Sequence, residues 1–379
     1  MARLEEVVEK TTGTRNPTKL PNDNFIYVDV ASVDNTEKTI VGARSILGAD
    51  APSRARKLIH TGDILISTVR PNLNAVALVQ ADLDGQVAST GFCVLRATTK
   101  VLPEYLFYFV ISHKFVDGLS ALVAGAMYPA VSDTQVLAQS LPVPSIAEQR
   151  RIIDILSRAE GIVKLRREAE KKSAELIPAL FLDMFGDPTT NPKGWPVFSL
   201  GEHVEIVSAV KTPDLSYDAD LPCIGADSIE GHTGKLISLP TVRDVRPISG
   251  KYRFKFGDVL YSKIRPYLAK VSLAPCVGYC SADMYPLSCK PSLRANFLLE
   301  LLLSKSFTEY ATAESVRAQM PKLNRQTLFA YKLPVPTIMI QEQFSDRANA
   351  VYSIQSQQSA ATATAKATFD ALLAQVFAG

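Results

Sequence analysis

Hydrophobic positions along the chain follow two spacings, and the same succession of spacings occurs twice. Short apolar runs at residues 25–28, 64–66 and 75–79 are bounded by Gly, Asn and Asp, which is typical of strands. A run at 103–110 begins with proline and predicts a helix. From Ser145 to Glu160 no Gly or Pro occurs, and apolar residues lie three and four apart, which predicts a long helix.

Two segments sustain this spacing for more than three heptads, which is the pattern of a coiled coil. The first predicted seam is Ile152, Ile155, Ala159, Ile162, Arg166, Ala169, Ser173, Leu176 and Leu180. The second is Phe344, Ala348, Val351, Gln355, Gln358, Thr362, Ala365, Phe369, Leu372 and Val376. The alternative is that each helix packs only on its own domain. We favour mutual packing, and the pattern leaves the relative direction of the helices open.

The two halves of the chain are related by an internal repeat. The phrase Leu-Pro-Val-Pro at 141–144 returns at 333–336, an offset of 333 − 141 = 192 residues. The run at 62–73 returns at 257–268, an offset of 257 − 62 = 195. A period this long is a duplicated domain, because solenoid units span roughly 20–50 residues.

The repeat and the breaks in composition divide the chain into four segments. Residues 1–144 and 188–336 are predicted to be similar globular domains of the α+β (mixed α/β) class, and 145–187 and 337–379 to be long helices. Pro178 should kink or end the first helix near its last turn. Residues 187–194, rich in Pro, Asn and Thr, are predicted to be a linker.

Composition narrows the class of protein. No apolar run reaches the roughly 18 residues of a membrane span, and the first residues lack the apolar core of a signal peptide, so we expect a cytoplasmic protein. Five cysteines fit a reducing compartment. Residues 192–336 carry 18 Lys and Arg against 13 Asp and Glu, so nucleic-acid binding would use local basic patches.

The sequence motifs of common catalytic and metal sites are absent. No phosphate loop, dinucleotide fingerprint, H-E-x-x-H or G-x-S-x-G occurs, nor the Asn-Pro-Pro-aromatic tetrapeptide of amino-methyltransferases. Cys276, Cys280 and Cys289 lie close together without a zinc-type pair, so we expect ordinary thiols and no bound metal.

The order of these motifs resembles the specificity subunit of type I restriction–modification systems. A variable domain is followed by Leu-Pro-Val-Pro, a glutamine at a fixed step (Gln149, Gln341), a long helix and Met-Phe-Gly-Asp at 184–187, and the pattern then repeats. Pro-Lys-Leu-Asn at 321–324 also fits the family, whereas Pro-Ala-Val-Ser at 129–132 departs from it.

The resemblance implies a protein that performs no chemistry itself. Each variable domain would be a target-recognition domain for one half of a split, asymmetric sequence in double-stranded DNA. The two helices would pair as an antiparallel coiled coil and dock two methyltransferase subunits, and restriction (translocase and nuclease) subunits are a further implied partner. The chain would bind no cofactor, and S-adenosylmethionine would be held by the methyltransferase.

A helix of roughly 38 residues is about 57 Å long, which is comparable to one and a half turns of B-DNA. We therefore hypothesise that the helix pair acts as a ruler between two half-sites.

The candidate DNA contacts are basic, amide or aromatic residues at or near predicted turns. In domain 1 they are Arg54, Arg56, Lys57, Arg70, Asn72 and Asn74. In domain 2 they are Arg243, Arg246, Lys251, Arg253, Lys263, Arg265, Tyr267, Lys270, Gln319, Lys322, Asn324 and Arg325. Arg70 and Arg265 recur at matched positions and are the strongest candidates. Each precedes a proline, so the alternative is that they brace a turn.

Two other functions compete with DNA recognition. The chain could be a protein-interaction scaffold with paired helices and no sequence specificity, which a weak salt dependence of DNA binding would favour. An enzyme with a dispersed site is disfavoured by the missing motifs, and binding of S-adenosylmethionine to the isolated chain would favour it.

Overall fold

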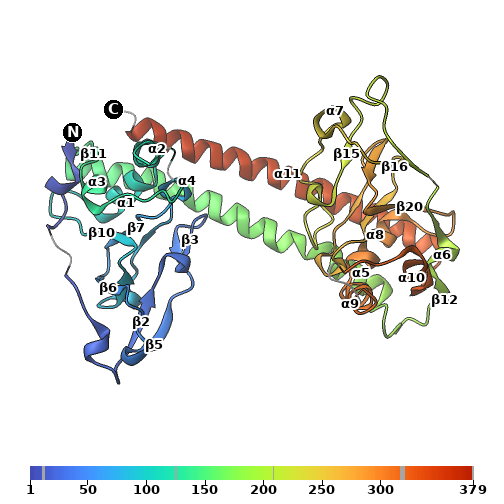
Figure 1. The fold of residues 1–379 in the computed structure, drawn as a ribbon, viewed down its shortest axis with the longest axis horizontal. Coiled ribbons are helices and arrows are strands. Elements are labelled where there is room, and N and C mark those ends of the chain that lie inside the picture. Colours follow the sequence, from blue (N-terminus) through green and yellow to red (C-terminus); the bar gives the residue numbers. More distant parts are fainter. Residues whose placement is uncertain (11–12, 124, 126, 208, 316–320, 378–379) are drawn as a thin grey trace. The chain divides into compact units, whose positions relative to one another are not determined.

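A computed structural model describes residues 1–10, 13–123, 125, 127–207, 209–315 and 321–377. The chain forms two compact units: unit 1 comprises Met1–Arg167 with Ala361–Gly379, and unit 2 comprises Glu168–Ala360. Each unit therefore contains one globular domain together with part of each long helix (Figure 1).

Domain 1 contains a three-stranded antiparallel sheet of order β10-β7-β8 and a four-stranded mixed sheet of order β5-β2-β9-β6. Two-stranded pairs β1-β11 and β3-β4 accompany them. The strands are β1 (Ala2–Arg3), β2 (Asn24–Val28), β3 (Val33–Asp34), β4 (Thr39–Ile40), β5 (Arg44–Leu47), β6 (Ala55–Leu58), β7 (Ile64–Ser67), β8 (Val76–Leu78), β9 (Val87–Ser89), β10 (Phe92–Leu95) and β11 (Ser140–Leu141). The helices are α1 (Pro103–Ile111), α2 (His113–Ala121) and α3 (Asp133–Leu137).

Domain 2 repeats the central strands of this plan, with sheets of order β13-β20-β17-β18 and β14-β16-β19-β15 and with the pair β12-β21. Its edge strand β14 pairs with β16, the equivalent of β6, whereas β5 of domain 1 pairs with β2. Its strands are β12 (Val197–Ser199), β13 (Val204–Glu205), β14 (Val210–Lys211), β15 (Cys223–Ile224), β16 (Lys251–Phe254), β17 (Val259–Ser262), β18 (Val271–Leu273), β19 (Gly278–Ser281), β20 (Met284–Cys289) and β21 (Lys332–Pro334). Its helices are α6 (Leu200–His203), α7 (Val242–Val245), α8 (Ala295–Leu303), α9 (Lys305–Ala313) and α10 (Arg325–Ala330).

The strand register shows that the duplication is structural. Leu95 of β10 lies opposite Ile64 of β7, and Leu287 of β20 lies opposite Val259 of β17. Both partners are shifted by the offsets of the sequence repeat, 287 − 95 = 192 and 259 − 64 = 195. The mixed α+β class and the two similar domains predicted from the sequence are therefore confirmed.

The long helices are α4 (Ile146–Ala174), α5 (Leu176–Phe185) and α11 (Ile338–Phe377). The break between α4 and α5 falls at Glu175, three residues before Pro178. Proline has no N–H and its ring collides with the carbonyl four residues earlier, here that of Ala174, so the predicted kink is confirmed. Gly186, with φ 79°, follows the end of α5.

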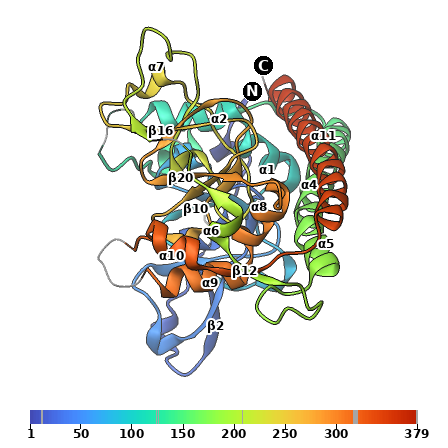
Figure 2. The ribbon, with the colours of Figure 1, turned by 90° about the vertical axis from the view of Figure 1, so that its right-hand side faces the viewer.

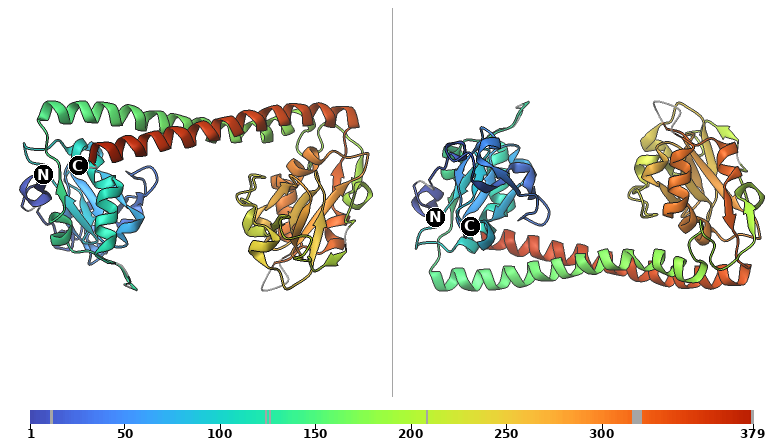
Figure 3. Two further views of the ribbon diagram at one scale, coloured as in Figure 1. Left: turned by 90° about the horizontal axis from the view of Figure 1, so that it is seen from above. Right: turned by 90° about the horizontal axis from the view of Figure 1, so that it is seen from below.

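The two helices are antiparallel within each unit (Figures 2 and 3). In unit 2 the Gln355 side chain donates to the Ser173 carbonyl at 2.6 Å, whereas Arg347, earlier on α11, reaches Met184, later on the other helix. In unit 1 the apolar core contains Ile152 from the start of α4 and Phe377 from the end of α11. The contacts therefore settle the direction that the sequence pattern left open.

Each helix end is anchored by an aromatic residue at matched positions, 377 − 185 = 192. The Phe377 ring lies 5.4 Å from that of Tyr105 on α1, and the Phe185 ring lies 4.8 Å from that of Phe297 on α8. Mutual packing and packing on a domain, posed as alternatives, therefore occur together. A helix contacts its own domain at its start and the other domain at its end.

The predicted seam is correct for α11 from Phe344 to Phe369, whereas at its end Leu373 and Phe377 are buried in place of Leu372 and Val376. It is wrong by one residue for most of α4. Ile155, Ile162 and Leu176 are 38%, 51% and 53% exposed. The residue after each of them is buried instead, namely Leu156, Val163 and Ile177. Adjacent apolar residues create two stripes one residue apart on this helix, and the domain core and α11 lie against the second stripe.

A buried glutamine joins the start of each long helix to its domain. Gln149 is fully buried; its side-chain oxygen accepts from the Leu102 N–H at 2.8 Å, and its amide donates to the Lys100 and Pro144 carbonyls, both at 3.0 Å. Gln341, also fully buried, bonds the equivalent groups of Arg294, Ser292 and Pro336 at 2.9, 3.3 and 2.8 Å. All four positions are shifted by 192 residues. One side chain thus satisfies three backbone groups that would otherwise be left unpaired in the interior.

A second matched contact is a hydrogen bond between a tyrosine and a glutamate. In domain 1 the tyrosine is on the domain helix and the glutamate on the long helix, and in domain 2 these two positions are exchanged. Tyr108 on α1 donates to Glu160 on α4 at 3.0 Å. At the equivalent positions Glu300 on α8 accepts from Tyr352 on α11, also at 3.0 Å. Burial raises the pKa of Glu300 to about 7, and the bond from Tyr352 opposes that rise only in part.

We expect Gln341→Leu to lower the free energy of unfolding by about 2–4 kcal/mol, because it leaves one N–H and two carbonyls unpaired in the interior. The measurement is denaturant unfolding of the full chain. The matched control is Gln343→Leu at an exposed position on the same helix, which should change stability by less than about 0.5 kcal/mol. Equal losses in both variants would contradict the bridging role.

We expect Glu300→Gln to stabilise the protein increasingly as pH rises from about 4.5 to 7. The folded-state pKa is raised, so the folded chain keeps a proton that the unfolded chain releases across this window. The wild type therefore loses stability progressively between pH 4.5 and 7, whereas the variant stays neutral and does not. The expected gain in unfolding free energy above pH 7 is on the order of 3 kcal/mol. Exposed Glu309→Gln should show no such pH-dependent gain.

Candidate nucleic-acid interface

Both domains build the same turn after the central strand of the β10-β7-β8 or β20-β17-β18 sheet. Arg70 has φ 51° and ψ 64°, and Arg265 has φ 50° and ψ 61°. Each arginine precedes a short 3₁₀ helix, Pro71–Leu73 or Pro266–Leu268. A left-handed backbone at a residue other than glycine costs on the order of 1–3 kcal/mol and is concentrated at functional sites.

Backbone contacts hold this turn, whereas the arginine side chains do not. The Arg70 N–H donates to the Pro129 carbonyl at 2.8 Å, and the Arg265 N–H donates to the Pro321 carbonyl at 2.9 Å. Both side chains are exposed and make no hydrogen bond or ion pair in the part of the chain that the structure describes. The turn is therefore braced by main chain, which leaves both guanidinium groups available for a ligand. The departure of Pro-Ala-Val-Ser from the family pattern does not change this contact.

The other candidates in domain 1 separate into exposed and internally bonded residues. Arg54 and Asn72 are exposed. Lys57 forms a 2.7 Å ion pair with Asp133, and Arg56 donates to the carbonyl of Ala55 at 2.7 Å.

Asn74 serves the fold of domain 1. Its side-chain amide donates to the Ile111 carbonyl at 3.1 Å, and its main-chain carbonyl accepts a hydrogen bond from Lys38. These bonds tie the 3₁₀ turn to the end of α1, so its position supports a structural role better than a base contact.

Most candidates of domain 2 lie in two places: around the Arg265 turn, and on α7 and β16. Arg265, Tyr267, Lys322 and Asn324 lie together, because an isolated bridge pairs Ile264 with Lys322. Arg243, Arg246, Lys251 and Arg253 lie on α7 and β16, where Arg246 (φ 45°) ends α7 (Figure 1). Gln319 lies outside the described residues.

Several of these side chains already have partners within the domain. Two are ion pairs: Arg243 with Asp220 at 2.9 Å and Lys322 with Asp283 at 3.9 Å. Three are hydrogen bonds: Lys251 donates to Ser249 at 2.8 Å, Lys270 donates to the Ala226 carbonyl at 2.6 Å, and the Asn324 side chain accepts from the Thr327 N–H at 2.8 Å. The Arg325 guanidinium lies over the Phe329 ring, 5.0 Å from its centre. Exposed pairs such as Arg243–Asp220 are weak and can open to a phosphate.

Lys263 corrects one prediction, since it lies in the interior of domain 2. It is 8% exposed, donates to the Ala282 carbonyl and lies 4.9 Å from the centre of the Tyr285 ring. Burial, and to a lesser degree nearby Lys322, lowers its pKa. The sequence could not reveal this, because Lys263 follows the polar end of a strand in the same way as an exposed turn residue.

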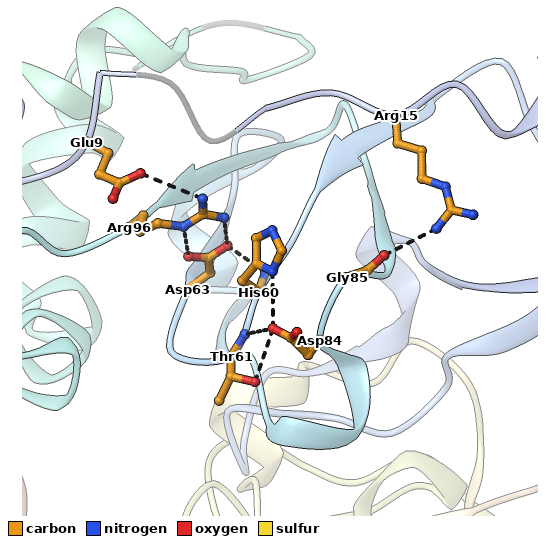
Figure 4. Close-up of polar contacts among 8 residues, drawn as sticks. All are labelled: Glu9, Arg15, His60, Thr61, Asp63, Asp84, Gly85 and Arg96. Atoms are coloured by element: carbon orange, nitrogen blue, oxygen red, sulfur yellow. Dashed lines mark hydrogen bonds and ion pairs between the residues drawn. The ribbon is translucent and has the colours of Figure 1, made fainter.

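One cation that the sequence analysis overlooked is Arg96, which is structural (Figure 4). Its guanidinium binds both carboxylate oxygens of Asp63, at 2.8 and 2.7 Å, and reaches Glu9 at 3.6 Å. The position 192 residues later is Ser288, which donates to Asp258 at 2.6 Å. Comparison of the two halves at this position would have indicated a packing role for Arg96.

The described residues contain no group of three or more His, Cys, Asp or Glu side chains that could hold a metal ion. All five cysteines are free thiols. No helix in the described part of the chain combines the length and apolar character needed to cross a membrane. Each of the two matched turns presents an exposed guanidinium group beside a hydrogen-bonded backbone, which suits a contact with phosphate or guanine.

The chain is similar in both sequence and structure to proteins of type I restriction–modification systems. The chain is 32% identical over 192 residues to the "Type I restriction enzyme EcoDI specificity subunit" of Escherichia coli, covering 50% of this chain and 42% of that protein. It is 31% identical over 169 residues to the HindI specificity subunit of Haemophilus influenzae, covering 44% and 34%. The matched part thus spans less than half the length of these relatives.

Two solved structures resemble the whole chain. One, described as "Structural basis underlying complex assembly and conformational transition of the type I R-M system", superposes with a TM-score of 0.64 at 30% identity over 99% of this chain and 96% of that chain. The type I S subunit from M. genitalium, at 12% identity and a TM-score of 0.57 over 99% and 95%, shares the fold.

The family described as "Type I restriction modification DNA specificity domain" matches residues 1–175 and again 192–361, which together make up most of the chain. The two matched segments agree with the two structural repeats described above. The chain therefore belongs to the type I restriction modification DNA specificity domain family and carries that domain twice.

Proposed function

We propose that this chain is the non-catalytic sequence-recognition subunit of a type I restriction–modification complex. Each domain reads one half of a split target in double-stranded DNA. The observation that carries this proposal is the pair of exposed arginines, Arg70 and Arg265, each on an identically strained turn. The same strained backbone is kept in two diverged domains, and neither side chain has an internal partner among the described residues, which supports a role for both arginines in binding a ligand.

The partners follow from the same proposal. Two methyltransferase subunits dock on the chain and hold the S-adenosylmethionine that supplies the methyl group, and a restriction subunit can join them. The assembly works in the cytoplasm, where it meets chromosomal DNA. A solved structure with the same fold is described in terms of complex assembly in the type I R-M system, which supports a partner-binding role for this chain.

The domains differ in charge and in their surface side chains, so we propose two different half-sites. The two arginines of α7 and its end in domain 2, Arg243 and Arg246, have no equivalent among the candidates of domain 1, whose exposed members are Arg54, Arg70 and Asn72. The unread gap is then set by the helices that continue from one unit into the other.

We expect Arg265→Ala to weaken binding to a mixed-sequence DNA duplex and to reduce the slope of log affinity against log salt by about one. Fluorescence anisotropy at several salt concentrations measures both quantities. The control is Arg347→Ala, which removes an exposed arginine from α11 and should leave affinity and slope unchanged. Wild-type binding that hardly depends on salt would favour the protein-interaction scaffold.

We expect one heptad inserted between Arg158 and Lys172, with a matching heptad in α11, to lengthen the gap in the methylated target. Seven helical residues add about 10 Å, so the increase is at most about three base pairs. The gap is measured by mapping methylated adenines with the partner methyltransferase present. An unchanged gap would exclude the ruler, and heptads inserted in α4 alone serve as the unmatched control.

A further inference from the structure

In each unit a hollow lies at the corner between the globular domain and the two long helices. In unit 1 a hollow of about 300 Å³ lies between the end of α1, the turn around Lys38, α4 and the last turns of α11. In unit 2 a hollow of about 390 Å³ lies between the end of α8, the turn around His232, α5 and α11. Both turn residues have a left-handed backbone, with φ 56° and 63°.

The two hollows are equivalent sites of the repeat. Their helical walls correspond at an offset of 192 residues, with the roles of the two long helices exchanged between the units, and the turn residues Lys38 and His232 differ by 232 − 38 = 194. The pairs are Ile111 with Leu303, Glu160 with Tyr352, Val163 with Gln355, Lys366 with Ala174, Asp370 with Pro178, and Leu373 with Phe181.

The hollow of unit 1 is occupied by charges that neutralise one another. Lys366 pairs with Asp370 at 2.7 Å, and Glu160 pairs with Lys164 at 3.1 Å. Arg167 reaches Glu37 at 3.0 Å across the same space. These pairs provide each carboxylate that lines the hollow with a cation, so none of its acids is left without an ion pair.

The hollow of unit 2 has lost those charges. Ala174 and Pro178 stand where unit 1 has the Lys366–Asp370 pair, and Ile177, Phe181 and Leu303 form apolar walls. This hollow stays open because the small side chains of Ala174 and Pro178 replace the longer charged side chains of Lys366 and Asp370.

One buried carboxylate remains in this apolar hollow. Glu300 is 7% exposed and accepts one hydrogen bond, from Tyr352, and it has no ion pair among the described residues. In the first hollow the acid of the matched Tyr–Glu contact is Glu160, at the position equivalent to Tyr352, and it has Lys164 as an ion-pair partner. At the rim Asp187 adds a second carboxylate with no ion pair in the described chain. The lysines of the rim are Lys235, which is exposed, and Lys305, which pairs with Glu309 at 3.6 Å.

The chemistry of this hollow defines its ligand. A volume of about 390 Å³ falls within the range of roughly 300–1,000 Å³ of small-molecule sites. Apolar walls favour an aromatic or branched aliphatic body, and a buried carboxylate without a cation favours a group that brings positive charge and N–H donors. We propose that the hollow between α5, α8 and α11 binds a small organic amine, with its ammonium group on Glu300 and its apolar body against Ile177, Phe181 and Leu303. This site is independent of DNA recognition.

The test is calorimetric titration of the full chain, without DNA, with phenethylamine as the probe. We expect saturable binding of one molecule per chain. Glu300→Gln keeps the shape and removes the charge, and should weaken binding at least tenfold. Ala174→Lys with Pro178→Asp transplants the ion pair of unit 1 into the hollow and should abolish binding. If that double variant fails to fold, Glu300→Gln alone decides.

The matched control is Glu160→Gln in the hollow of unit 1, which should leave binding unchanged. Phenylacetate, which has the same ring with the opposite charge, should not bind. Absence of phenethylamine binding, or equal binding by the wild type and Glu300→Gln, would overturn the proposal. A loss of binding in Glu160→Gln would do so as well, because it would place the site in the other unit.

Discussion

The architecture depends on a buried amide at the start of each long helix. Gln149 and Gln341 each pair with one N–H and two carbonyls, and those groups belong to the segment that leads into the helix and to the loop before α1 or α8. An unpaired buried polar group costs about 1–3 kcal/mol, so the helix can leave the domain in only one direction without losing these bonds. At each of these junctions between a domain and the start of a long helix, the end of the other long helix also packs on the domain, through Phe377 on α1 or Phe185 on α8.

The same junction between domain and helices occurs in both halves of the chain. The two halves can therefore differ in sequence wherever neither this junction nor the hydrophobic core constrains them. The left-handed arginine turn keeps its backbone contacts in both domains, whereas Arg96 of the first domain becomes Ser288 in the second. The Tyr–Glu contact survives with its residues exchanged between Tyr108–Glu160 and Glu300–Tyr352. A protein that keeps its geometry and changes its side chains in this way suits the recognition of two different half-sites.

The sequence predicted the repeat, the strands around Ile64, the kink near Pro178 and most of the seam of α11, because each depends on local spacing or on proline chemistry. It failed for the seam of α4, where Ile155 and Leu156 are equally apolar neighbours and only tertiary packing selects the second. It also failed for Lys263, since charge alone does not show that a side chain turns inward to a carbonyl and a ring. The exchange between Tyr108 and Glu300 required knowing which helix faces which.

The central claim is that this chain alone specifies a split DNA target for a partner methyltransferase. The most direct measurement is a map of N6-methyladenine in a methylation-free host that expresses this chain with the methyltransferase encoded beside it. We expect a motif of two different half-sites separated by a fixed gap, absent when this chain is omitted. A stable complex of the two proteins that methylates no site, or methylation that persists without this chain, would contradict it.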